Sequence, residues 1–152
     1  MALACNAEII IADEPTTALD VTVQAQIMEI LREIKHNYNL SLILITHDLG
    51  IVAQNADKVA VMYAGRVVEY APVKDIFEHP KHPYTQALLN VILDINTDEV
   101  KTIEGQPPAI TDDISGCPFH PRCSQCMEIC TKSDPQLKMT DNNTKVACHL
   151  YF

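Results

Sequence analysis

The first part of the chain alternates between strand-like and helix-like hydrophobic patterns. Residues 8–12 (EIIIA) are a short apolar, β-branched run that ends before Pro15, whose nitrogen cannot donate to a strand ladder. Apolar residues then recur every three or four positions from Val23 to Tyr38, which predicts an amphipathic helix with Asp20 as its N-cap. Residues 41–46 (SLILIT) form a second apolar run. Such continuous runs are typical of strands buried on both faces, so we predict a parallel strand–helix–strand unit.

Shorter elements are predicted further along the chain. Residues 58–63 and 66–70 alternate around Ala64-Gly65, which indicates a β-hairpin. Residues 73–78 and 84–93 have helical patterns, and Pro80 ends the first of them. From about residue 96 the pattern breaks, and residues 105–123 are rich in glycine and proline. A segment this irregular needs another source of order, and cysteines are the candidates.

Composition narrows the class of protein. The 152 residues are 47% hydrophobic, with 20 acidic and 11 basic residues and a formal net charge of -9. This length suffices for one hydrophobic core with an appendage. The hydrophobic content excludes a disordered chain, and no uncharged apolar stretch approaches the ~18 residues of a membrane span. The acidic balance argues against nucleic acid as a partner.

The chain contains six cysteines, of which five lie between Cys117 and Cys148. The first residues lack a basic segment followed by a long apolar run, so we expect no signal peptide and therefore no disulfides. The clustered thiols then indicate metal or redox chemistry. We expect Cys5, which lies apart from the others, to be a buried core thiol.

Polar residues follow both predicted parallel strands. Asp13-Glu14 comes after the first strand and His47 after the second, so all three are expected at one edge of the sheet, where open α/β folds bind ligands. An aspartate there can hold Mg²⁺ on a nucleotide, a glutamate can deprotonate water, and a histidine can contact a phosphate. The alternative is a polar strand exit with His47 as a helix cap.

The longer strings IIIADEPTTALD and LILITHD resemble the second half of an ABC-transporter ATPase domain. The resemblance implies that residues 9–13 are the Walker B motif, ending in the Mg²⁺-ATP ligand Asp13. It also implies that Glu14 is the catalytic base and His47 the switch histidine. Residues 17–20, ending in Asp20, would be the D-loop that contacts a second subunit.

Other motifs of that family are absent from these 152 residues. No Gly-x-x-x-x-Gly-Lys-Ser/Thr phosphate loop, Q-loop or LSGGQ signature occurs. We therefore expect a C-terminal part of such a protein. We hypothesise that it does not hydrolyse ATP alone, because positioning of the phosphates supplies most of phosphoryl-transfer catalysis. We also expect a bare sheet edge and marginal folding.

The segment HPKHPYTQALL (79–89) resembles oligopeptide and dipeptide importer ATPases within the ABC family. We expect His79 and His82 to be turn residues rather than ligands. The expected fold class is α/β, with residues 1–70 as the C-terminal part of a P-loop ABC ATPase domain that has a parallel βαβ core. Residues 71–152 would be an irregular, Cys-rich C-terminal extension.

The extension carries cysteines at 117, 123, 126, 130 and 148. The same family has four cysteines at the places of Cys117, Cys123, Cys130 and Cys148, and some members bind a [4Fe-4S] cluster there. Three alternatives stay open, namely an iron–sulfur cluster, structural Zn²⁺ and reduced buried thiols. Cys126 is an extra thiol that leaves the ligand set open. We expect His120 and His149 to lie beside the thiols or on the surface.

The resemblance implies an ATP-binding subunit of an importer of oligopeptides or dipeptides, located at the cytoplasmic face of the membrane. Its expected partners are a second ATP-binding subunit, transmembrane permease subunits and, indirectly, a peptide-binding protein. One alternative is a stand-alone metal-binding or interaction module that retains an ATPase remnant. Another is an ABC protein of DNA repair or translation, against which the HPYTQALL segment and the cysteines argue.

Overall fold

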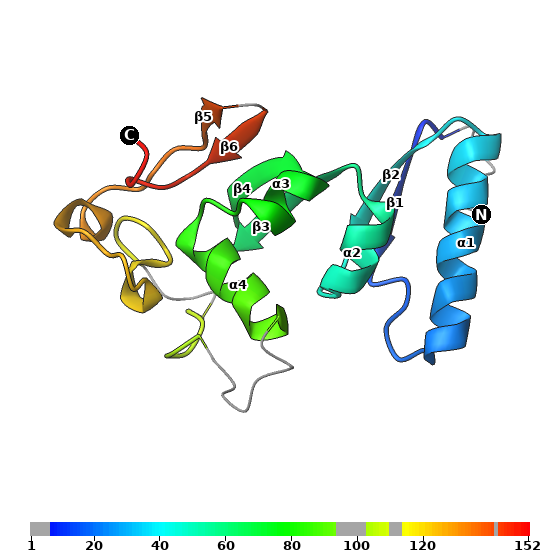
Figure 1. Cartoon of the computed structure of the whole chain (residues 1–152), viewed down its shortest axis with the longest axis horizontal. Helices are drawn as coiled ribbons and strands as arrows, with labels where there is room; N and C mark the ends of the chain where they lie inside the picture. Colours follow the sequence, from blue (N-terminus) through cyan, green and yellow to red (C-terminus); the bar gives the residue numbers. More distant parts are fainter. Residues whose placement is uncertain (1–6, 94–102, 110–113, 142) are drawn as a thin grey trace. The chain divides into compact units, whose positions relative to one another are not determined.

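The computed structural model describes residues 7–93, 103–109, 114–141 and 143–152. The chain divides into two compact units, Met1–Ala56 and Asp57–Phe152, which are treated separately below (Figure 1). Cys5 lies outside the described residues, so its expected burial stays a prediction.

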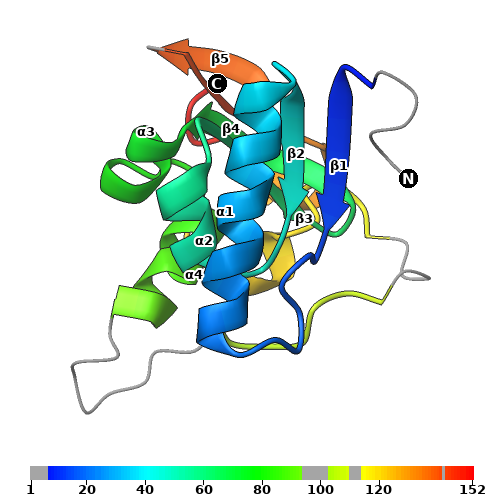
Figure 2. The same ribbon diagram turned by 90° about the vertical axis from the view of Figure 1, so that its right-hand side faces the viewer.

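Unit 1 contains β1 (Ile9–Asp13), α1 (Val21–Asn37), β2 (Ser41–Ile45) and α2 (Leu49–Asn55). The two strands pair in parallel, with Ile9 opposite Ser41 and Asp13 opposite Ile45. Helix α1 runs alongside this strand pair (Figures 1 and 2). As predicted, Asp20 caps α1, and its Oδ1 accepts hydrogen bonds from the backbone N–H groups of Thr22 and Val23 at 2.9 and 3.0 Å.

The expectation that both strands of unit 1 are buried on both faces is wrong. Exposure alternates along each strand, and the exposed face carries Ile9, Ile11, Ile43 and Ile45, which are 49 to 65% exposed. β1 and β2 form a two-stranded sheet, and no other described strand extends it. Within unit 1, no described element buries the face that carries these isoleucines.

Helix α2 was not predicted from the sequence. Its N-cap is Asp48, whose Oδ1 accepts hydrogen bonds from the N–H groups of Gly50 and Ile51 at 2.8 and 3.2 Å. An aspartate followed three residues later by an apolar residue was the available signal. The end of β2 at Ile45 and the N-cap Asp48 are only three residues apart, so His47 is held between a strand and a helix.

Unit 2 is built on a four-stranded antiparallel sheet in the order β3-β4-β6-β5. The predicted hairpin is confirmed as β3 (Lys58–Tyr63) and β4 (Arg66–Pro72). Ala64 and Gly65 both have positive φ angles, 47° and 76°, as a tight two-residue hairpin turn requires. The predicted helices are α3 (Val73–Glu78) and α4 (Pro83–Leu93).

Two further strands of unit 2, β5 (Lys138–Asp141) and β6 (Thr144–Val146), lie in the segment expected to be irregular. β6 pairs with β4, Val146 opposite Glu69, so the cysteine-bearing segment joins the hairpin in one sheet. Two 3₁₀ turns also lie in this segment: η3 (His120–Arg122), between Cys117 and Cys123, and η4 (Glu128–Thr131), which contains Cys130. The expected domain boundary at residue 70 falls within β4.

The core of unit 2 is continuous. Phe119, Ile76, Val146 and Ala71 are at most 2% exposed. The ring of Phe119 packs against Tyr63 and Tyr84, with centroids 5.1 and 5.4 Å apart. Among the helices that the structure describes, none is long and apolar enough to cross a membrane.

Candidate functional site

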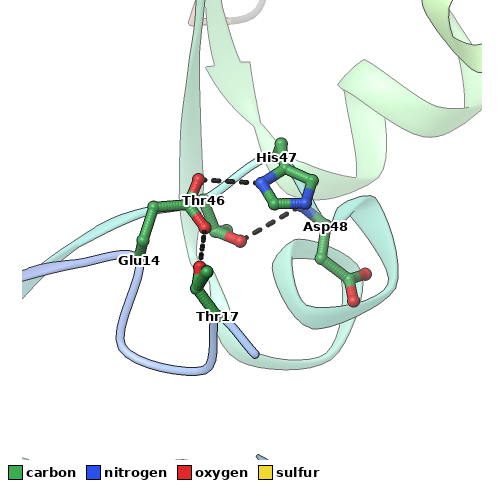
Figure 3. A network of polar contacts seen from close by, with 5 residues as sticks. All are labelled: Glu14, Thr17, Thr46, His47 and Asp48. Atoms are coloured by element: carbon green, nitrogen blue, oxygen red, sulfur yellow. Dashed lines mark hydrogen bonds and ion pairs between the residues drawn. The ribbon is translucent and has the colours of Figure 1, made fainter. Parts of the chain in front are cut away.

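Glu14, Thr17 and His47 form a polar network in unit 1 (Figure 3). His47 Nδ1 lies 2.8 Å from Glu14 Oε1, and because a carboxylate only accepts, the imidazole is the donor. The Thr17 hydroxyl donates to Glu14 Oε2 at 2.7 Å. The sequence prediction that the acid and the imidazole meet at one sheet edge is therefore confirmed in geometry.

The network shifts the protonation equilibria of both partners. Hydrogen bonds from His47 and Thr17 lower the pKa of Glu14 below its usual 4.5. The hydrogen bond to Glu14 raises the pKa of His47 above its usual 6.5. The side chain of His47 is 82% exposed, so solvent screens this ion pair and it contributes little to stability.

The backbone around the network explains its position. Glu14 follows β1 with a positive φ of 47°, and its N–H still donates to the Ile45 carbonyl at 2.9 Å. On the other strand, the Asp48 N–H donates to the Thr46 hydroxyl at 3.1 Å. Both ends of the parallel pair are thus tied down, and the side chains of Glu14 and His47 converge.

The other two predicted residues of this site are near but not part of the network. Asp13 is the last residue of β1, and its side chain is on the exposed side of the strand. Asp20 is engaged as the N-cap of α1. No described contact joins either carboxylate to Glu14 or His47.

Unit 2 contains a second candidate site, a small pocket that we call the cysteine pocket. It brings together four of the predicted thiols, those of Cys117, Cys123, Cys130 and Cys148. The remaining lining residues are three histidines and a mainly apolar set, namely His82, Pro83, Phe119, His120, Gln125, His149 and Leu150. The space inside is about 10 Å³, about what one water molecule needs.

Cys117 and Cys130 are held together by the backbone. The N–H of Cys117 donates to the Cys130 carbonyl at 2.8 Å. Gly116 makes this approach possible, because its φ is +72° and a Cβ there would lie 2.3 Å from the Cys130 carbonyl oxygen. The glycine therefore allows the backbones of Cys117 and Cys130 to come together.

Cys126 differs from the other four cysteines of the extension. It is exposed and does not line the cysteine pocket, whereas Cys117, Cys130 and Cys148 are buried. Burial raises the pKa of the Cys148 thiol to about 11, and it raises the pKa of Cys117 and Cys123 as well. Without a bound cation these thiols are protonated at neutral pH.

The donor chemistry of the pocket fits a thiophilic metal, since thiolates favour zinc and iron–sulfur centres. In the described part of the chain, however, no group of three or more His, Cys, Asp or Glu side chains has the arrangement needed to hold a metal ion. The predicted metal ligands therefore stay a prediction.

Sequence reasoning missed a buried carboxylate, Glu69 on β4, which is fully inaccessible. Its Oε1 accepts the N–H of Lys81 at 2.8 Å and its Oε2 accepts the N–H of His82 at 2.9 Å. The available signal was an acid inside the otherwise apolar strand sequence RVVEY. Glu69 thereby anchors the HPKHPY segment to the sheet.

Comparison with known proteins identifies the class, that of ATP-binding subunits of ABC transporters. The family described as "Oligopeptide/dipeptide transporter, C-terminal region" matches residues 68–130. The chain is similar to the oligopeptide and dipeptide branch of these ATP-binding subunits and aligns with a C-terminal region of them.

Similar relatives come from several bacteria. The chain is 48% identical over 153 residues to the dipeptide transport ATP-binding protein DppD of Caldanaerobacter subterraneus subsp. tengcongensis, covering 99% of this chain and 47% of the relative. It is 55% identical over 137 residues to the oligopeptide transport ATP-binding protein OppD of Salmonella typhimurium, covering 89% of this chain and 41% of that protein. The chain thus spans about half the length of the curated relatives it matches.

Proposed function

We propose that this chain is a C-terminal part of an ATP-binding subunit that couples ATP hydrolysis to uptake of oligopeptides or dipeptides. The observation that carries the proposal is the 2.8 Å contact between Glu14 and His47 at the carboxyl ends of two parallel strands. The relatives' names, which all describe transport ATP-binding proteins, support the same assignment.

The proposed roles follow from the chemistry of each side chain. The low pKa of Glu14 keeps its carboxylate ionised, so it can accept a proton from an attacking water. Asp13 would hold the Mg²⁺ that accompanies ATP, and this ion would neutralise phosphate charge. His47, largely exposed, would contact the terminal phosphate, and Asp20 would face a second ATP-binding subunit.

The proposed site lacks a cradle for the phosphates within these 152 residues, because no phosphate-loop sequence is present. We therefore expect the chain by itself to release no phosphate from ATP above the rate of the Glu14→Gln variant. The measurement is phosphate release from the purified chain with Mg²⁺-ATP. Turnover that depends on Glu14 would contradict this part of the proposal.

Peripheral association with a membrane complex is the second part of the proposal. The expected partners are transmembrane permease subunits, a second ATP-binding subunit and, indirectly, a peptide-binding protein. Immobilised chain should retain detergent-solubilised permease subunits of a peptide importer. Failure to retain them, together with stable metal binding, would favour a stand-alone metal-binding module instead.

We further propose that Cys117, Cys123, Cys130 and Cys148 hold a metal centre, an iron–sulfur cluster in the first instance. Its support is the convergence of these four thiols on the cysteine pocket. The exposed Cys126 does not line the pocket, although its thiol contacts that of Cys130. When bound, such a centre would supply a cross-link that orders a segment rich in glycine and proline.

The metal proposal is tested by anaerobic purification followed by visible absorption and by iron, sulfide and zinc analysis. We expect a brown protein whose colour is lost in Cys117→Ser and kept in the matched control Cys126→Ser. Colourless protein with stoichiometric zinc would replace the iron–sulfur assignment by a zinc site. Metal-free wild-type protein would overturn the metal centre altogether.

A further inference from the structure

His82 is the most deeply buried histidine that lines the cysteine pocket. Only 1% of its surface is exposed, and its ring packs near Phe119 with centroids 5.9 Å apart. The sequence predicted a turn residue here. His82 does lie in the bend before α4, but a turn residue needs no burial, so the depth of this imidazole goes beyond that prediction.

The backbone of the segment before α4 is fixed from several sides. Glu69 accepts the N–H groups of Lys81 and His82. Gln86 Nε2 donates to the Pro80 carbonyl at 3.0 Å, and the Tyr151 hydroxyl donates to the Lys81 carbonyl at 3.0 Å. These bonds give the His82 ring a defined place in the pocket wall.

The contacts of His82 also fix its tautomer. The backbone N–H of Tyr84 donates to His82 Nδ1 at 3.0 Å, so Nδ1 carries a lone pair and no proton. The proton of the neutral ring therefore lies on Nε2. Burial lowers the pKa of His82 to about 4, which keeps the ring neutral at physiological pH.

The other two histidines of the pocket each place one ring nitrogen against a backbone carbonyl oxygen. His120 Nδ1 lies 2.9 Å from the Cys117 carbonyl, and His149 Nε2 lies 2.9 Å from the Ser133 carbonyl. Each of these nitrogens donates, because a carbonyl oxygen only accepts. In their neutral forms the remaining nitrogens of both rings are acceptors. Of the three, only His82 keeps an N–H that is not used on the backbone.

We propose that the Nε2–H of His82 donates a hydrogen bond to a cysteine thiolate of the metal centre in the cysteine pocket, making His82 a positioning residue. The inference rests on the metal centre proposed above. A thiolate has no proton to donate and gains from an N–H donor in a water-poor pocket, where such a bond is strong. Hydrogen bonds to ligand sulfur also raise the reduction potential of an iron–sulfur centre.

The test compares two near-matched variants in the anaerobically reconstituted 152-residue chain. His82→Leu replaces the ring by an apolar side chain of similar size and so removes the Nε2–H donor. His82→Gln provides an amide N–H in its place. We expect the equilibrium constant for reduction of the metal centre to be about tenfold lower in His82→Leu than in the wild type. For a one-electron couple this lowers the reduction potential by about 59 mV. His82→Gln should recover most of this shift. The exposed His79→Gln in the same segment is the control and should leave it unchanged.

A second set of measurements tests the inference if the bound metal is zinc or if His82→Leu does not fold. When the wild type and His82→Leu are both loaded with Co²⁺, the thiolate-to-metal absorption should lie at lower energy in His82→Leu. In the zinc-loaded wild type, nitrogen-correlated proton NMR should find the His82 proton on Nε2. A proton on Nδ1 would overturn the inference.

The two proposals fail in distinguishable ways. If the wild type and His82→Leu bind metal equally and share one potential and one charge-transfer energy, the role of His82 is refuted while the metal centre stands. If the wild type binds neither iron–sulfur, Zn²⁺ nor Co²⁺ through its thiols, the metal centre is refuted and the inference falls with it.

Discussion

Unit 1 and unit 2 differ in how well they bury their apolar side chains. In unit 2 a continuous core surrounds Phe119, Ile76 and Val146, each at most 2% exposed. In unit 1 the isoleucines on one face of β1 and β2 are about half exposed, and Met28 of α1 is one of few buried side chains among the described residues. The unit with the family's ATPase motif therefore has the poorer core.

The contrast in burial shows that a polar site can be well positioned even where the surrounding apolar side chains are poorly buried. Glu14 and His47 meet because two parallel strands end side by side and a capped helix follows the second strand. That arrangement needs few buried residues. The cysteine pocket, in contrast, is assembled from residues far apart in sequence, and it depends on the sheet and on Phe119.

The largest expected effect is the loss of the Phe119 ring. Phe119→Ala should lower the free energy of unfolding by about 3–5 kcal/mol, because it empties the centre of a packed aromatic cluster. The control Ile11→Ala, at a 65% exposed position of β1, should change it by less than about 0.5 kcal/mol. Urea denaturation followed by tyrosine fluorescence measures both, and equal effects would remove the contrast between the units.

Gly116→Ala should cost about 3 kcal/mol of unfolding free energy, since it combines a left-handed backbone with a clash at the Cys130 carbonyl. Gly65→Ala is the matched control. Gly65 has a similar φ of +76° but no atom within 4 Å of the added Cβ, so we expect only about 1 kcal/mol. Denaturation curves of the two variants separate the clash from the backbone strain, and a Gly116→Ala cost no larger than that of Gly65→Ala would speak against the close approach.

Amide hydrogen exchange compares the units in the unmodified chain. We expect amides of β4 and β6 to exchange at least about tenfold more slowly than those of β1 and β2, because exchange protection follows buried contacts. Mass spectrometry of peptic fragments resolves the four strands. Slower exchange in β1 and β2 would mean that unit 1 is better stabilised than its exposed isoleucines indicate.

Asp20→Ala should destabilise α1 by about 1 kcal/mol, because two backbone N–H groups lose their acceptor. Asp20→Asn keeps an oxygen acceptor and should be close to neutral. Thermal unfolding followed by circular dichroism at the helix signal measures the difference. If Asp20→Ala and Asp20→Asn lose the same stability, the effect comes from the charge of Asp20 and not from capping.

The smallest expected effect concerns the Glu14–His47 ion pair. The pair exists between the lowered pKa of Glu14 and the raised pKa of His47. Its contribution is therefore lost as pH rises through the His47 pKa and as pH falls through the Glu14 pKa. In Glu14→Gln the pKa of His47, measured by NMR titration, should fall back toward 6.5. Thr17→Val is the control, since it removes a bond to Glu14 and leaves His47 with its partner.

Much of unit 1 could be predicted because its signals are local. The apolar runs, the capping Asp20 and the polar ends of the strands lie within short stretches of sequence, and periodicity and capping act at that range. The burial of the strands could not be predicted. A continuous hydrophobic run shows that a strand is suited to a buried position, but it does not show whether another element covers that strand. Ile9 and Ile43 illustrate the difference.

The sequence by itself determined the family, the strand–helix–strand order and the residue types available at both sites. Only the tertiary structure decided that β6 joins β4, that Glu69 anchors the segment before α4, and that Cys126 stays outside the cysteine pocket. The physical reason is that these contacts join residues far apart in the chain. Their formation depends on packing and on satisfying buried polar groups, neither of which leaves a periodic pattern in the sequence.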